Sequence, residues 1–462
     1  MSRPPAATAP LGLWSSIAFS APALPVAAFL VTVGVYVAPH YSGPLGLDIG
    51  LVGLGFMIVR LLDMPVDFLL GLAMDRTRSR FGRYKLWLVI GGPLMMVSVY
   101  FLYFAKPGVS LAYFVFWMLV VYVGYSILYL AHSAWASSLA RTYDDRSRLY
   151  GVMAAVGVAG SSLALLAPDI VHWAAPAAKV GVSTMGGFIM LCVPLGLVLA
   201  LWHTPETVAV ERPHQPRFEL RDYLSLIARP SMARVVICDF FLSVGPIWTG
   251  AIYVFFFTDS RGFTSEQTRL LLVLYMLAGF FGAPLTARLA IAIGKHRAAM
   301  ISIAAWGIIL LALLIMPRGS LPLGSFLMFV LGFLASGFTV ITRAMTADVA
   351  DEVRLEQGRE RAGVLFAFTT LVAKLSGAFS IGVSYMILGA VGYRSGAVNT
   401  PEAIQGMVLT YIIAPVVCMI VAAICLWGYP LTKARHAEIR RRLDLADAEA
   451  AAETQIAGRA LP

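Results

Sequence analysis

The chain has 462 residues, of which 59% are hydrophobic and 13% are charged, and its formal net charge is +10. A soluble protein of this length could not bury so much apolar surface, so the composition excludes a soluble globular protein. The basic residues fall in short loops between apolar segments. They are therefore better explained as determinants of membrane topology than as a nucleic-acid-binding surface, and no nucleic-acid partner is expected.

Apolar segments of the length that spans a bilayer recur along the chain. Six are expected near residues 14–39, 49–74, 85–105, 110–138, 149–173 and 180–202. Six more are expected near 231–257, 266–291, 297–316, 321–346, 362–390 and 404–428. The pattern predicts an all-α membrane protein with twelve transmembrane helices in two halves, 1–202 and 231–428, a central loop at 203–230 and a charged tail at 429–462.

Lysine and arginine concentrate in the loops after the second, fourth, eighth and tenth predicted spans, whereas the other loops between spans in each half hold about one basic residue each. Basic loops remain on the cytoplasmic side of a membrane. We therefore expect the central loop and both termini in the cytoplasm, in a bacterial inner (plasma) membrane. The N-terminal segment lacks the pattern of a cleaved signal peptide, so the first span is expected to remain in the mature protein.

Motifs of enzymes and metal proteins are missing from the sequence. It contains no HExxH motif, no Walker loop and no CxxC pair, and its four cysteines all lie in apolar segments. An enzyme or an ATP-driven pump is therefore not expected, and no cofactor is expected beyond a coupling ion.

The second span carries Arg60, Asp63 and Asp67, which share one helical face. Insertion of a charged side chain at the centre of a membrane helix costs about 2.5–3.5 kcal/mol, so each of these charges is expected to have a function or a partner. Two carboxylates one turn apart suit a monovalent cation such as sodium, or a proton. The alternative is a buried Arg60–Asp63 pair that only holds helices together.

Lys374 lies near the centre of the eleventh span, too deep to reach the membrane surface easily. Its expected partner is Asp63 or Asp67 of the other half. Such a pair, together with Arg60, would couple charges across the two halves. A partner on a neighbouring helix of its own half is the alternative.

Three further polar groups lie within spans. We expect solvated or capping roles for Asp169 and Asp239, because both lie near a predicted helix end. For His132, a hydrogen-bonded structural role is favoured over a role as a ligand.

A glycine and charge motif lies at the cytoplasmic end of the second span. Glycine allows close helix approach, and a carboxylate among arginines can form a charge lock between helix ends. We expect a cytoplasmic gate here, although a plain topology signal is the alternative. Its residues are Gly71, Asp75, Arg76, Gly82 and Arg83.

Three segments together resemble the glycoside–pentoside–hexuronide:cation symporter family of the major facilitator superfamily. They are the segment 60–67, the loop motif 75–85 and the segment 374–379. The resemblance implies the major facilitator fold. It also implies that Asp63 and Asp67 bind the coupling cation, that Lys374 matches the family's lysine of span eleven, and that Trp135 lies beside the sugar.

The sequence departs from this family where the family's melibiose permease binds sugar. The first span holds no acidic residue, and Ala131 and Val156 stand where that pattern has an acid and an arginine. The remaining pocket is expected to rest on Trp135, His132, Tyr125 and Tyr129, with Lys374 as its only cation.

These features predict a sodium- or proton-coupled symporter for a glycoside, hexuronide or related small polar solute. The alternative is a transporter of a lysophospholipid-like amphiphile on the same frame, because eukaryotic relatives of the family carry lysophospholipids. The expected partners are the small-molecule substrate and membrane lipid, and a monomer is expected.

Overall fold

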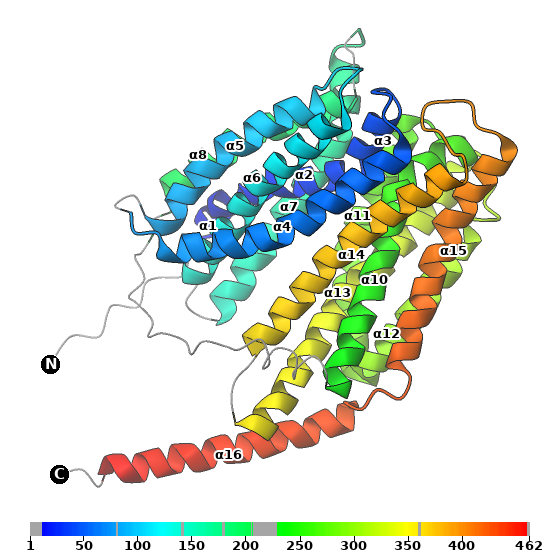
Figure 1. Cartoon of the computed structure of the whole chain (residues 1–462). Helices are drawn as coiled ribbons and strands as arrows, with labels where there is room; N and C mark the ends of the chain where they lie inside the picture. Colours follow the sequence, from blue (N-terminus) through cyan, green and yellow to red (C-terminus); the bar gives the residue numbers. More distant parts are fainter. Residues whose placement is uncertain are drawn as a thin grey trace. The chain divides into compact units, whose positions relative to one another are not determined.

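The computed structural model describes residues 12–79, 82–139, 143–177, 181–204, 206, 229–358 and 362–459. These ranges form helices and loops and contain no strand. Figure 1 shows the helices in chain order. In the first half they are α1 Leu13–Ser20, α2 Ala23–Thr32, η1 Val33–Val37, α3 Ala38–Ser42, α4 Ile49–Arg76, α5 Arg83–Tyr103, α6 Leu111–Leu139, α7 Tyr143–Ala174 and α8 Val182–His203.

The second half repeats the pattern. It contains α10 Pro230–Phe255, η2 Phe256–Ser260, α11 Ser265–Ile293, α12 Lys295–Ala312, α13 Leu321–Gln357, α14 Ala362–Ala390 and α15 Pro401–Leu426. A further helix, α16 Lys433–Arg459, follows in the tail.

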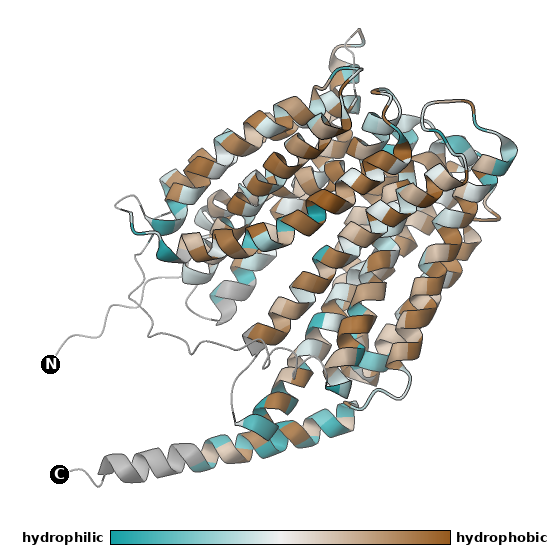
Figure 2. Cartoon of the chain, viewed as in Figure 1, coloured by the Kyte–Doolittle hydropathy of each residue, from teal (hydrophilic) through white to brown (hydrophobic). Residues whose placement is uncertain are grey.

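Within the described residues, twelve spans are long and apolar enough to cross a membrane, which confirms the predicted number. A helix suits this environment because it satisfies every backbone hydrogen bond within one segment. Figure 2 shows apolar residues along most of these helices and polar residues at their ends and on α16.

The chain divides into two compact units whose bounds differ from those of the two six-span halves. The first unit contains residues 1–214, 250–273 and 381–407, and the second contains 215–249, 274–380 and 408–462. Each unit has its own packed interior.

Close helix contacts in the first unit rely on glycine. A Cβ added at Gly160 of α7 would meet the backbone of Leu24 in α2, and one at Gly124 of α6 would meet the backbone of Met95 in α5. The start of α4 approaches the end of α14 in the same way, through Gly53. Without a side chain, glycine lets two backbones come close enough for van der Waals contact in a membrane.

The second unit carries a charged cluster where α16 meets α13. Lys295 Nζ donates to Asp348 Oδ1 over 2.6 Å. His436 Nε2 lies 3.1 Å from Asp348 Oδ1 and 3.0 Å from Asp351 Oδ2. Farther along α16, hydrogen bonds from two arginines lower the pKa of the Glu438 carboxyl to about 2. The tail is therefore a helix anchored to its unit by charged side chains.

Candidate cation and substrate sites

Asp63 is the most deeply buried of the charged residues predicted for the site. Its side chain is 1% exposed, in the middle of α4. Ser126 Oγ of α6 donates to Asp63 Oδ1 over 3.2 Å. Arg60 Nη1, one turn earlier, lies 3.7 Å from Asp63 Oδ2, and its guanidinium lies 4.7 Å from the centre of the Tyr122 ring. The carboxylate therefore has polar partners but no access to bulk water.

A proline lies between Asp63 and Asp67 in α4. Pro65 has no N–H, so the carbonyl of Leu61 four residues earlier receives no helical hydrogen bond from it. Asp67 follows, half-buried, and interacts electrostatically with Arg60. Asp63 and Asp67 lie one turn apart on one face of α4, whereas Leu61 lies on the opposite side of the helix. The two carboxylates supply oxygen ligands of the kind that a monovalent cation requires.

Two of the predicted pocket residues form an aromatic pair on α6. The rings of Tyr125 and Tyr129 stack with centroids 5.7 Å apart. Tyr125 is 8% exposed, whereas Tyr129 is 48% exposed. The pair therefore connects the buried surroundings of Asp63 with an accessible surface of the first unit.

The other two predicted pocket residues are packed against α1 in this structure. His132 Nε2 forms a 2.8 Å hydrogen bond with the carbonyl oxygen of Phe19, and the Phe19 ring contacts Trp135 edge-on with centroids 5.0 Å apart. Lys85 Nζ lies 5.5 Å from the centre of the Trp135 ring. His132 and Trp135 are 3% and 1% exposed, so their expected contact with substrate stays a prediction.

The predicted gate is organised by a residue that sequence reasoning missed. Glu206 accepts hydrogen bonds from the backbone N–H groups of Arg83, Tyr84 and Lys85 over 2.8, 2.9 and 3.1 Å. These groups begin α5 and have no partner within the helix. Gly82 precedes them with φ +100°, and a Cβ there would overlap Glu206. In the sequence, the only sign of this contact is that Glu206 is an acidic residue in the polar stretch that follows a long apolar span.

The other gate residues contribute less to this contact. Arg76 lies in the last turn of α4. A Cβ added to Gly71 meets no described atom within 4 Å, so no close helix contact relies on this glycine here. The side chain of Asp75 lies outside the described part of the chain, and its place in a charge lock stays a prediction.

Replacing Glu206 with glutamine should weaken the start of α5. The amide accepts fewer hydrogen bonds and loses the charge that favours a helix N-terminus, so we expect a loss of about 1–3 kcal/mol in unfolding free energy. Thermal unfolding of the purified protein measures the change. Glu449→Gln, at an exposed position of α16, is the control, and an equal melting temperature for E206Q and wild type would contradict the assigned contact.

Two expectations for acidic residues were wrong. Asp169 of α7 is not a solvated or capping residue, because Arg269 of α11 binds it with two hydrogen bonds, one of them 2.8 Å long from Nε. Asp239 is not solvated either: it is 7% exposed in the interior of α10, where it lines a cavity of the second unit. Hydropathy and helical periodicity do not reveal which side chain of a neighbouring helix meets a given acidic residue.

Lys374 belongs to α14 and to the second unit, where it is half-buried. Its pairing with Asp63 or Asp67 stays a prediction.

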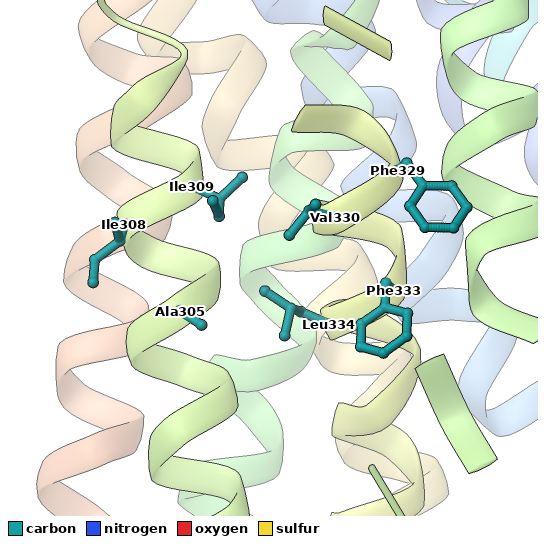
Figure 3. A pocket seen from close by; sticks show the side chains of 7 residues that line it. All are labelled: Ala305, Ile308, Ile309, Phe329, Val330, Phe333 and Leu334. Atoms are coloured by element: carbon teal, nitrogen blue, oxygen red, sulfur yellow. The ribbon is translucent and has the colours of Figure 1, made fainter. Parts of the chain in front are cut away.

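An apolar groove between α12 and α13 is a poor candidate for a substrate site. It measures about 520 Å³ and is open to the outside of the helices. Figure 3 shows its lining of Ala305, Ile308, Ile309, Phe329, Val330, Phe333 and Leu334. Such a surface lacks the few polar groups that orient a small solute, and lipid chains suit it better.

Comparison with known proteins identifies the class of this chain. Residues 18–433 match the family described as MFS/sugar transport protein. The chain belongs to this family. It is a multi-pass membrane protein with the major facilitator fold, and it is a secondary transporter.

Its relatives differ in what they carry. A putative glycoside/cation symporter, YagG of Escherichia coli (strain K12), is 27% identical over 88% of this chain and 89% of its own length. Sodium-dependent lysophosphatidylcholine symporter 1 of Xenopus tropicalis is 22% identical over 84% of this chain and 81% of its own. The solved structure of the nucleoside transporter NupG aligns with a TM-score of 0.67 at 14% identity, over 90% and 99% of the two chains.

Proposed function

We propose that this chain is a cation-coupled symporter that moves a glycoside, hexuronide or related small polar solute across the bacterial inner membrane by alternating access. Sodium or a proton drives it. The termini and the central loop lie in the cytoplasm, as the distribution of basic residues predicts.

The observation that carries the proposal is the buried Asp63. A carboxylate that is 1% exposed in a membrane helix is costly, and a structural pair alone would favour a closer ion pair than the 3.7 Å contact with Arg60. Binding of a cation or a proton neutralises such a group. With Asp67 one turn away on the same helix face, the site holds two carboxylates for this purpose.

The glycoside assignment is supported by the family description and by the E. coli relative. The frog relative supports the second candidate, an amphiphile such as a lysophospholipid. The exposed aromatic ring of Tyr129 fits either, because an aromatic face can cover a sugar ring or an acyl chain.

A thermal-shift screen of the purified protein separates these candidates. A ligand that binds only the folded state stabilises it by about 2.7 kcal/mol at one hundred times its Kd. We expect at least one glycoside or uronide to raise the melting temperature, and to do so more in sodium chloride, or at lower pH, than in choline chloride at neutral pH. Stabilisation by lysolipids alone, with no response to any sugar or uronate, would contradict the glycoside assignment.

A further inference from the structure

A cavity inside the second unit has no role in the function proposed above. It measures about 370 Å³ and is lined by α10, α11, α13 and α14. Pockets for small organic ligands measure about 300–1,000 Å³, so this space suits a solute rather than a single ion. Among the described residues that line it, Asp239 alone carries a charge.

Asp239 is an expensive residue in this position. It is 7% exposed and lies nine residues after the start of α10 at Pro230, about 14 Å along the helix axis. The Asp239 carboxylate interacts with the Thr342 hydroxyl and electrostatically with the exposed Arg343. A carboxylate has about four acceptor positions, so one hydroxyl leaves most of its capacity for another donor.

The same face of α10 offers further polar groups to the cavity. Pro246 lacks an N–H, so the carbonyl of Leu242 receives no helical hydrogen bond from it. Ser243 lies one turn after Asp239, and all four residues line the cavity. Three oxygen groups that can accept hydrogen bonds therefore lie within two turns of one helix.

The facing walls combine hydroxyls with aromatic rings. Ser336 and Thr339 of α13 line the cavity, and the Ser336 hydroxyl donates to the Phe333 carbonyl over 2.8 Å, which leaves its lone pairs for a ligand. Tyr275 and Phe338 add rings whose faces can cover the C–H side of a pyranose. Few convergent polar groups on a mostly apolar wall are typical of a site for a small polar solute.

We propose that this cavity binds a hydroxyl-bearing sugar ring of the transported solute, with Asp239 as the acceptor for its hydroxyls. The inference rests on the proposed glycoside transport and narrows it. A uronate would bring a second negative charge beside Asp239, so the site selects neutral glycosides over hexuronides.

Direct binding to the full chain in lipid nanodiscs tests this inference. The probes are nitrophenyl glucosides, galactosides and xylosides, a nitrophenyl glucuronide, and a nitrobenzylamine, whose amine is protonated at neutral pH. We expect D239N to weaken the best neutral glycoside at least tenfold, because an amide loses the charge-assisted hydrogen bonds. Asp447→Asn, on the exposed side of α16, should leave the affinity unchanged. The coupling ion, sodium or a proton, should stabilise D239N as much as it stabilises wild type.

A second measurement does not depend on the charge variant. Ser243→Cys, with the four native cysteines replaced by alanine, should react with N-ethylmaleimide, and the neutral glycoside should slow the reaction at least fivefold. Ser320→Cys, before α13 and outside the cavity, should react at a rate that the glycoside does not change.

The outcomes separate the two proposals. If a glycoside binds wild type but D239N keeps its affinity and Ser243→Cys is not protected, the inference fails and glycoside transport stands. Tighter binding of the glucuronide or the amine also overturns the inference. If no glycoside or uronide binds wild type at all, the proposed function fails and the inference fails with it.

Discussion

Replacement of Asp63 by asparagine is expected to abolish ion-driven accumulation of substrate. The variant keeps the shape of the side chain but removes the charge that a cation or proton would neutralise. In proteoliposomes with a tenfold sodium or proton gradient, wild type can accumulate substrate by about tenfold, whereas D63N should only equalise the two sides. Exchange of labelled for unlabelled substrate should survive, because it requires no net movement of the ion.

Folding of D63N should survive the change. Arg60 loses a partner, but its side chain is 17% exposed and it also interacts with Asp67. Gel filtration and thermal unfolding check this. Asp48→Asn, at the exposed N-cap of the same helix, is the matched control and should accumulate substrate normally. Full gradient-driven accumulation by D63N, by D67N and by the double variant would exclude this pair of acids as the coupling site.

The second large effect is expected at the Asp169–Arg269 pair of the first unit. Asp169 belongs to the fifth span and Arg269 to the eighth, so the pair links one span of each six-span half. The two side chains are only 23% and 11% exposed. Alternating access requires contacts between the halves to break at the end that opens. Loss of this pair should therefore favour the state in which this end is open.

Labelling of Met57→Cys by a membrane-impermeant maleimide measures that opening. Met57 packs against Gly382 of α14 within the same unit, so it should become reactive when this contact parts. Truncation of one partner in a buried charge pair costs about 2–5 kcal/mol, and even about 2 kcal/mol shifts an equilibrium roughly 30-fold. We expect D169N and R269Q to raise the labelling rate at least tenfold and to slow uptake.

Charge reversal provides the specific control for this pair. Each reversed single variant, D169R and R269D, should behave as the neutral variants do, and the double variant should recover part of the wild-type labelling rate. Asp48→Asn should leave labelling unchanged. Equal labelling of Met57→Cys in wild type, D169N and R269Q would show that the pair does not hold this end closed.

Sequence reasoning placed the helices well because the membrane imposes a strong pattern. A span of about 20 apolar residues is readable without knowledge of its neighbours, and twelve such spans were predicted and found. The first span shows where the pattern was less precise. Pro22 separates α1 from α2, and the membrane span proper covers Ala23–Ser42 rather than 14–39. Hydropathy alone does not mark such a break.

Side-chain partners were predictable only within one helix. The Arg60–Asp63 contact follows from a spacing of three residues in the sequence, and the structure contains it at 3.7 Å. Ser126, which donates to the same carboxylate, lies 63 residues away and gave no signal. Two other contacts gave no signal either. Glu206 binds the start of α5 from 121–123 residues away, and Arg269 binds Asp169 from 100 residues away.

The membrane class, the number of spans and the charged face of the second span could be predicted from the residues alone, because hydrophobicity and helical periodicity are local properties. The packing of the helices was needed to find that Asp63 is buried beside Ser126, that His132 binds the Phe19 carbonyl, and that Asp239 lines a cavity. Burial and hydrogen bonding between helices depend on which faces pack together. That choice is made by many side chains and glycines at once, so no single motif contains it.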